Sequence, residues 1–277
     1  MADSGCLVSE SSEKLSNSPS LKRSKQLKAH KSQRIAKDVF DIETTVCRAM
    51  CMIDFGFPVC YIYNPIEYAS ETHINFLDKY CTSTKKVLFL GMNPGPFGMA
   101  QNGVPFGDTS FVKDWLEIDG EVRKPLKEHP KRPILGLDCK RSEVSGSRLW
   151  GLIKQLCKTP EVFFSSCFIH NYCPLVFMNE SGKNITPPNL PVEQRKQLYN
   201  ICDQALIEMV ELLGTDTVVG IGKFAEGRCR SVLKDSSIRV YPLMHPSPAS
   251  PIANAGWSEI AMRQLQEAGL MQVLIVD

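Results

Sequence analysis

The chain has 277 residues, of which 43% are hydrophobic, and its formal net charge is +2. This length supports a full hydrophobic core, and because no run of about 18 consecutive apolar residues occurs, we expect no membrane-spanning helix. The start lacks a charged segment followed by an apolar one, which argues against secretion. The 11 cysteines have irregular spacing and no CxxC pair, which favours free thiols in a reducing compartment over an iron–sulfur or zinc site.

The first 40 residues differ in composition from the rest of the chain. Residues 1–20 contain seven serines, and residues 22–37 contain seven Lys or Arg and no acidic residue. We expect 1–40 to form a disordered tail, Ser-rich and then basic, and 41–277 to form one folded domain. The basic stretch is either a plain solvated segment or an arm for nuclear targeting or nucleic-acid binding.

Beyond the tail, the pattern predicts alternating helices and strands. In chain order these are a helix over 38–54, a helix over 64–80, a strand over 86–90, structured loop over 96–145, a helix over 145–157, a strand over 162–169, a helix over 191–213 closed by Gly214, a strand over 217–221, a helix over 223–233, a strand over 238–243 and a helix over 257–268 closed by Gly269. This order predicts an α/β fold, namely a single three-layer α/β/α domain with a central, mostly parallel four-stranded sheet.

Polar groups follow the ends of these strands. In such a sheet, ligands bind outside the carboxyl ends of the strands. The first strand is followed by Met92 and Asn93, the second by His170 and Asn171, and the fourth by Met244 and His245. The sequence therefore predicts a site made of two amides and one or two imidazoles at one edge of the sheet.

Several kinds of chemistry lack their residues here. The strand ends carry no pair of carboxylates for a two-acid glycosidase, no Ser or Cys in a nucleophile elbow and no P-loop. The stretch GIGKFAEG at 220–227 is either a tight strand-to-helix turn or a close backbone approach to a phosphate. What remains are neutral hydrogen-bonding groups and one His, which stabilise a transition state rather than attack covalently.

Three motifs together resemble the uracil-DNA glycosylase superfamily: GMNPGPFGMAQNGVPFGD at 91–108, HNYCPL at 170–175 and HPSP at 245–248. The form GMNPGPFG resembles the single-strand-selective monofunctional branch and departs from the GQDPYH form of the uracil-specific branch. The resemblance extends over roughly residues 45–277. It implies an enzyme of base-excision repair that flips a damaged base out of the DNA stack and hydrolyses its N-glycosidic bond.

The resemblance also implies a role for each motif residue. His245 would donate a hydrogen bond to the uracil O2 as negative charge develops there, and Asn93 would position the water. Asn171 would read the Watson–Crick edge of the base, whereas His170 would point away. Phe106 would stack on the flipped ring, with Phe97 as a competitor for that position.

Gly95 stands where the uracil-specific branch has a Tyr that blocks C5 substituents. The space beside C5 would hold a water bound by the backbone near Met92 and Gly95, which a hydroxyl of the ligand can replace and a methyl cannot. We therefore expect uracil, 5-hydroxymethyluracil and 5-formyluracil to be accepted and thymine to be rejected.

The segment HPSPASPIANAGW at 245–257 resembles the loop that wedges into the duplex, although alanines, Ala249 and Ala255, stand where some relatives have a basic residue. A second loop over 181–195 is either a DNA contact or a plain solvated loop. The residues expected to contact DNA are Lys183, Asn184, Ser247, Pro248, Ala249, Ser250, Pro251, Ile252, Ala253 and Asn254.

No lysine occurs in the pocket motifs, so we expect no Schiff base and no strand cleavage. We expect no cofactor and no metal, a monomer in the nucleus, and single- and double-stranded DNA containing a damaged pyrimidine as the partner. Two alternatives remain: a catalytically idle DNA-binding member of the same fold, and an enzyme acting on free nucleosides, for which a wedge loop would have no purpose.

Overall fold

Four parallel strands form the central sheet of the computed structural model, which describes residues 19–275 of the chain. They are β2 (Val87–Gly91), β3 (Cys167–Asn171), β6 (Thr217–Ile221) and β7 (Arg239–Leu243), in the order β3-β2-β6-β7. Every residue of β2 and β6 is buried, which explains their continuous apolar runs. The edge strand β7 is partly exposed and tolerates Pro242. The parallel four-stranded sheet confirms the predicted fold class.

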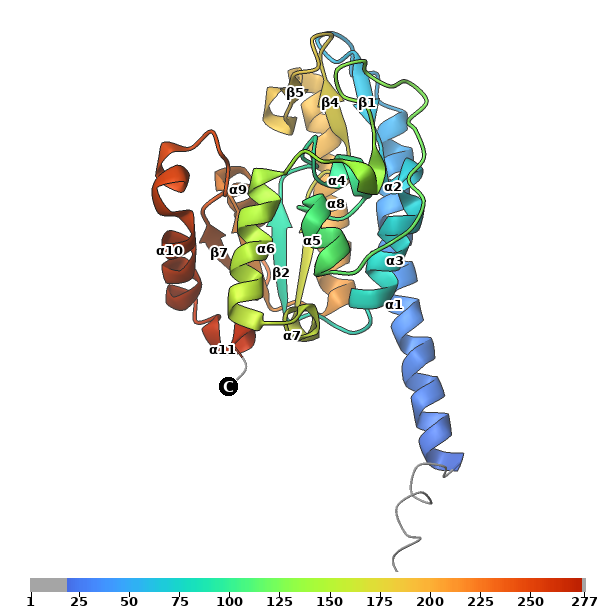
Figure 1. Cartoon of the computed structure of the whole chain (residues 1–277), viewed down its shortest axis with the longest axis vertical. Coiled ribbons are helices and arrows are strands. Elements are labelled where there is room, and N and C mark those ends of the chain that lie inside the picture. Colours follow the sequence, from blue (N-terminus) through green and yellow to red (C-terminus); the bar gives the residue numbers. More distant parts are fainter. Residues whose placement is uncertain (1–18, 276–277) are drawn as a thin grey trace, which may run out of the picture.

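Helices cover both faces of this sheet (Figure 1). One group contains α1 (Pro19–Cys51), which packs against both α3 (Ser70–Tyr80) and α8 (Val192–Leu213), and α9 (Lys223–Val232), which packs against β6, β7 and α8. The other group contains α6 (Val144–Cys157), α7 (Pro160–Ser166), α10 (Pro251–Glu267) and α11 (Met271–Leu274). None of the helices within 19–275 is long and apolar enough to cross a membrane.

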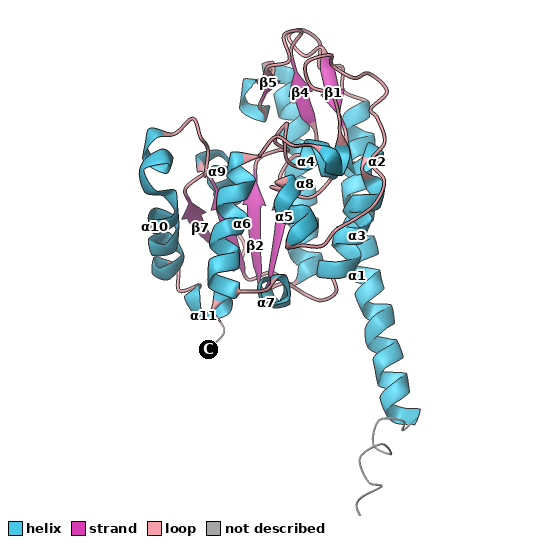
Figure 2. Ribbon diagram, viewed as in Figure 1, coloured by secondary structure: helices cyan, strands magenta, loops and turns pink. Residues whose placement is uncertain are grey.

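A second, small antiparallel sheet was not expected from the sequence. It consists of β1 (Tyr61–Tyr63), β4 (Val176–Met178) and β5 (Asn184–Ile185) in the order β1-β4-β5, and Figure 2 shows it beyond the carboxyl ends of the central strands. The region expected to be loop at 96–145 contains the short helices α4 (Met99–Asn102), α5 (Thr109–Asp114) and the 3-10 turn η1 (Gly136–Asp138). Another 3-10 turn, η2 (Pro187–Asn189), precedes α8.

The strand expected at 162–169 is wrong in its first half. Residues Pro160–Ser166 form α7, and β3 begins only at Cys167. Pro160 stands in the first turn of the helix, where proline costs no hydrogen bond. Phe163 and Phe164 are both buried, packed against Trp150, so tertiary contacts fix a helix in an apolar run that also suits a strand.

The expected disordered tail is also wrong for the part of it that the structure describes. Helix α1 begins at Pro19 rather than at residue 38, and Ile35, Ala36 and Val39 are buried in the core, so the folded domain begins before residue 41. Residues 1–18, the Ser-rich part of that tail, lie outside the described residues.

Two other predicted helices have different boundaries. The helix expected at 64–80 is divided at Ala69 into α2 (Pro65–Tyr68) and α3. The last helix begins at Pro251 and is interrupted at Gly256, whose backbone is not helical, so its longer part agrees with the expected 257–268. Gly214 closes α8 and Gly269 follows α10, both with positive φ as a helix terminus favours.

Candidate functional site

A cavity of about 290 Å³ lies at the carboxyl ends of the central strands. It brings together all six residues that the sequence singled out for recognition and cleavage of a base: Met92, Asn93, Gly95, Phe106, Asn171 and His245. Ser247 and Pro248 also line it. A separate hollow of about 380 Å³ between α5 and residues 137–142 contains none of these six.

Asn171 is the buried polar end of the cavity. It is the last residue of β3 and is only 2% exposed. Its amide nitrogen donates to the Met99 sulfur at 3.2 Å, while its Oδ1 is buried without a hydrogen-bond partner. A buried acceptor left unpaired is costly unless a ligand completes it. Asn171 therefore presents an unsatisfied acceptor, with one further N–H available beside it.

Asn93 follows β2 and is half-buried. Its Nδ2 donates to the Leu175 backbone oxygen at 3.4 Å. This contact orients the amide, because only the nitrogen can donate to a carbonyl, and it leaves Oδ1 free to accept a hydrogen bond from a water. The residue can therefore hold a water without acting as a strong base.

Phe106 provides the aromatic wall of the cavity. Its φ of 54° lies in the left-handed region, which is unusual for a bulky side chain. Helix α6 holds this conformation. The Phe106 carbonyl accepts a hydrogen bond from Trp150 Nε1 at 3.1 Å, and it lies so close to Gly146 that a Cβ added there would be 2.0 Å from the carbonyl oxygen. Such strain persists where the surroundings enforce it, often at functional sites.

Phe97, the competitor for that role, does not line the cavity. The Arg141 guanidinium lies over its ring at 3.8 Å from the centroid, and that of Arg132 lies at 5.3 Å. The ring is thus occupied by cation–π contacts with two arginines. Of the two phenylalanines, only Phe106 is available to stack on a ligand.

His245 is held at the other side of the cavity, with its ring centroid 6.2 Å from that of Phe106. Helix α10 fixes the preceding residue, since Trp257 Nε1 donates to the Met244 oxygen at 2.7 Å and Gln264 accepts from the Met244 N–H at 2.8 Å. Gly222, with φ of 86°, allows close approach: a Cβ there would lie 3.1 Å from His245 Cβ. Burial lowers the pKa of His245, so its ring is neutral at neutral pH.

The stretch at 220–227 has the geometry of the first interpretation, and a contact with a phosphate there stays a prediction. This stretch is a tight turn from β6 into α9, with Gly222 at its corner. The position favours glycine because its φ is positive and an added Cβ would crowd His245.

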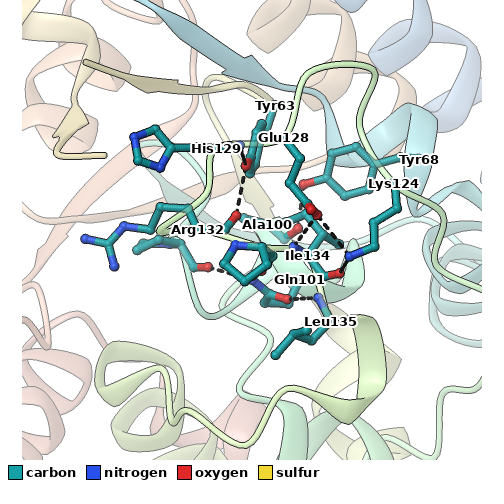
Figure 3. A network of polar contacts seen from close by, with 12 residues as sticks. Tyr63, Tyr68, Ala100, Gln101, Lys124, Glu128, His129, Arg132, Ile134 and Leu135 are labelled. Atoms are coloured by element: carbon teal, nitrogen blue, oxygen red, sulfur yellow. Dashed lines mark hydrogen bonds and ion pairs between the residues drawn. The ribbon is translucent and has the colours of Figure 1, made fainter. Parts of the chain in front are cut away.

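Figure 3 shows a network of polar contacts that includes Gln101, Glu128, Ile134 and Leu135. The buried side chain of Gln101 donates to the carbonyls of Pro96 and Pro133, both at 3.1 Å, and accepts from the Leu135 N–H at 2.8 Å. Glu128 likewise accepts from the Ile134 N–H at 2.8 Å and from Lys124 at 3.0 Å. Gln101 thus ties Pro96 to the segment 133–135, which supports this part of the wall.

Glu143, Ser145 and Thr186 also line the cavity and were not expected from the sequence. Glu143 lies just before α6, and its Oε2 accepts from the Phe97 N–H at 3.3 Å. Burial raises the pKa of this carboxyl, and the nearby Asp108 raises it further. The sequence carries only a weak signal for Glu143, its place before a predicted helix, where an acidic residue usually serves as a cap.

The expected DNA contacts are distributed unevenly. Pro251 and Ile252 are exposed at the start of α10, with Ile252 62% exposed, and Ala249 and Lys183 are exposed as well. Asn184 instead lines the cavity, and its Oδ1 is buried without a partner. Ser250 is half-buried and caps α10 by accepting from the Ala253 N–H at 3.3 Å.

The DNA contact expected at Ala253 is wrong. This residue is 3% exposed and packs into the core, so its side chain cannot contact DNA. Asn254 is exposed but is engaged within the protein, accepting from Arg148 at 2.8 Å and donating to the Pro248 oxygen at 2.9 Å. Arg148 also donates to the oxygens of Pro246 and Ser247, at 3.2 and 3.4 Å, and so anchors this loop from α6.

His170 does not line the cavity, as expected. Its Nδ1 lies 3.3 Å from Glu43 Oε1 in α1. Within residues 34–275, whose side chains are described, no group of three or more His, Cys, Asp or Glu has the arrangement of a metal site.

Comparisons with known proteins agree with this geometry. The family model of the uracil DNA glycosylase superfamily matches residues 78–264. The chain is 51% identical over 245 residues to the single-strand selective monofunctional uracil-DNA glycosylase of Rattus norvegicus, with 88% of each chain covered. It is 54% identical over 224 residues to the corresponding protein of Bos taurus, covering 80% of this chain and 82% of that one.

The fold has a counterpart among solved structures. The crystal structure of wild-type Pedobacter heparinus SMUG2 superposes with a TM-score of 0.61 at 19% sequence identity, covering 86% of this chain and 98% of that one. This likeness concerns the fold, whereas the family match and the relatives near 50% identity span most of the sequence. The chain therefore belongs to the uracil DNA glycosylase superfamily.

Proposed function

We propose that this protein is a monofunctional DNA glycosylase of base-excision repair. It removes uracil, 5-hydroxymethyluracil and 5-formyluracil from single- and double-stranded DNA, leaves an abasic site, and acts in the nucleus as a monomer. The observation that carries the proposal is the buried, unpaired Oδ1 of Asn171, in a cavity shared with Asn93, Phe106 and His245.

Asn171 supplies the recognition. Its Oδ1 accepts the N3–H of a flipped uracil, and its free N–H donates to O4. Cytosine offers an acceptor at N3 and a donor at N4, so it would leave the buried Asn171 acceptor facing another acceptor. A site built to pair with the donors and acceptors of uracil therefore rejects cytosine strongly, because its own buried polar groups would be left unpaired.

The cleavage step needs no covalent intermediate with the protein. The bond between N1 of the base and C1′ of the sugar breaks, and its electron pair leaves with the base as an anion. His245 donates a hydrogen bond to O2, where that charge accumulates. The water held by Asn93 forms the new C1′–O bond and releases one proton, so the products are the free base and an abasic sugar.

Among residues 34–275, whose side chains the structure describes, no lysine lines the cavity. A Schiff base at C1′ requires an amine, so this site supports base removal without strand cleavage. The name of the Rattus norvegicus relative, which contains the word monofunctional, is consistent with this reading.

The exposed start of α10 is suited to opening the duplex. Apolar side chains that enter a base step unstack it and give access to the base, and Ile252 is a large, 62% exposed apolar residue next to Pro251. We propose that Ile252 enters the space that the flipped base leaves, while residues 247–249 lie along the strand.

The test is alkali-revealed base release from matched oligonucleotides carrying uracil, 5-hydroxymethyluracil, 5-formyluracil or thymine, in single and double strands. Wild type should release the first three bases. His245→Ala should lose at least about 100-fold, as loss of one such donor costs, with an unchanged melting temperature.

Three outcomes would contradict the proposal. Release of thymine near the uracil rate would overturn the substrate range. DNA binding with no release from any strand would point to a catalytically idle member of the fold. Cleavage of free deoxyuridine as fast as of the oligonucleotide would point to a nucleoside enzyme.

A further inference from the structure

The Glu143 carboxyl lies against the part of the cavity wall that follows β2. A Cβ added at Gly95 would lie 2.5 Å from Glu143 Oε2 and 3.2 Å from Oε1. A Cβ at Gly98 would lie 2.9 Å from Glu143 Cγ. Two glycines thus leave the space that this side chain fills, and the carboxyl ends at the cavity surface.

The local fold does not need this carboxyl. The backbone at the start of α6 is fixed by Asp108, whose Oδ2 accepts from the Glu143 N–H at 2.9 Å and from the Ser142 hydroxyl at 2.7 Å. The Glu143 side chain itself accepts from the Phe97 N–H at 3.3 Å, and the Ser145 N–H also interacts with its carboxyl. A carboxylate can accept about four hydrogen bonds, so Glu143, which lines the cavity, has acceptor capacity left for a ligand.

The position of a bound base determines which of its atoms lie near the Glu143 carboxyl. With O2 of uracil on His245 and the N3–H and O4 edge on Asn171, the ring positions that remain are C5 and C6. Phe106 covers a face of the ring. The remaining polar lining comprises residues 92–96, Glu143, Ser145, Asn184, Thr186 and Ser247, and Glu143 is the one carboxylate among these described residues.

We propose that Glu143 is the residue that reads the C5 substituent of the base, an inference that rests on the proposed function. A 5-hydroxymethyl group donates its O–H to the carboxylate. Hydrogen bonds to a charged partner are about twice as strong as neutral ones. Uracil leaves space for a water that keeps the carboxylate hydrated, whereas the methyl of thymine displaces that water and offers no donor.

The same arrangement predicts the response to a charged substituent. A 5-carboxyl group would bring a second carboxylate against Glu143, and like charges in a partly buried site repel. Wild type should therefore reject 5-carboxyuracil more strongly than its size alone requires.

The experiment measures single-turnover release of uracil, 5-hydroxymethyluracil, thymine and 5-carboxyuracil from one single-stranded sequence. It compares wild type, Glu143→Gln, Glu143→Ala and the control Glu208→Gln, an exposed glutamate on α8. Each rate is divided by the uracil rate of the same protein, so a uniform loss from a disturbed loop cancels.

In Glu143→Ala, the ratio of 5-hydroxymethyluracil to uracil should fall by about tenfold or more, and the ratio of thymine to uracil should rise. In Glu143→Gln, which keeps the size and loses the charge, the ratio of 5-carboxyuracil to uracil should rise about tenfold. The control should keep the ratios of wild type.

Each result decides one claim. If wild type releases uracil but all ratios in both Glu143 variants stay within about twofold of wild type, Glu143 does not read C5 and the proposed function stands. If Glu143→Ala does not fold, the 5-carboxyuracil ratio of Glu143→Gln decides alone. If wild type releases no base, the proposed function is wrong and this inference with it.

Discussion

Gly91, the last residue of β2, shows how a single residue sets the geometry of the cavity. A Cβ added there would lie 2.4 Å from Asn171 Oδ1 and 2.7 Å from the Phe106 ring. Both contacts are far inside normal packing distance, and neither neighbour can give way freely, because Asn171 is buried and the Phe106 backbone is held by Trp150. The base-reading amide and the stacking ring therefore meet only because this position has no side chain.

We predict that Gly91→Ala lowers uracil release by about 100-fold, since displacing a binding group by about 1 Å can cost that much. The measurement is single-turnover release at saturating enzyme, alongside the melting temperature.

Gly227→Ala is the matched control, because a Cβ there has nothing within 4 Å and the residue lies within α9. Equal activity losses in the two alanine variants would contradict the account of Gly91.

At the scale of elements, the strand-end positions could be predicted from the sequence pattern, Phe106 only from the family resemblance, and Glu143 not at all. Asn93, Asn171 and His245 follow three parallel strands, and parallel strands bring their carboxyl ends to one edge. Glu143, just before α6, lines the cavity, and Arg148 in α6 holds the loop after β7, and the place of both depends on how that helix packs.

The difference between α7 and the strand expected there has a similar cause. The run VFFSSCFI is apolar enough for either element, and its length does not separate them. Packing on Trp150 selects the helix for its first half. The small sheet β1-β4-β5 was missed because strands of two or three residues show too few alternations to produce a pattern.

Arg148 leads to a prediction about the loop between β7 and α10. It joins the carbonyls of Pro246 and Ser247 to the Asn254 side chain, and so fixes the segment that carries Ile252. We predict that Arg148→Ala lowers release from double-stranded DNA by about tenfold, roughly the loss of one charged hydrogen bond, and affects single strands less, since only a duplex must be opened.

Ile252→Ala should shift the ratio of double- to single-strand release in the same direction. Lys154→Ala is the control, because Lys154 is an exposed basic residue on the same helix α6. If Arg148→Ala reduces both substrates equally, its role is in the fold of the site rather than in opening the duplex.

At the scale of the whole molecule, one buried ion pair joins α1 to the rest of the domain. His73 in α3 donates from Nδ1 to the Gly103 oxygen at 2.7 Å and from Nε2 to Glu43 at 2.6 Å, and His170 at the end of β3 lies 3.3 Å from the same carboxylate. Both hydrogen bonds of His73 end on acceptors, so its ring is protonated when Glu43 is ionised. The pair connects α1 with the backbone three residues before Phe106.

The pKa values of this pair predict how stability depends on pH. Burial alone would raise the pKa of Glu43, but the charge of His73 and the hydrogen bonds from His170 and His73 lower it to about 2, from 4.5. Burial would lower the pKa of His73, but Glu43 raises it above 6.5. Glu43 therefore stabilises the fold above pH 4.5 and loses this effect as the pH falls toward 2. His73 stabilises it fully below pH 6.5 and loses this effect as the pH rises through its raised value.

We accordingly expect the pair to contribute most between pH 4.5 and 6.5. Glu43→Gln should lower the free energy of unfolding by roughly 3–5 kcal/mol at pH 6, because it leaves a buried charge unpaired, and should flatten the loss of stability below pH 4.5. Urea unfolding from pH 3 to 8 measures both effects. The double variant Glu43→Gln, His73→Gln should recover part of the loss, since no unpaired charge remains. Parallel pH profiles for wild type and Glu43→Gln would show that the pair is not ionised in the folded protein.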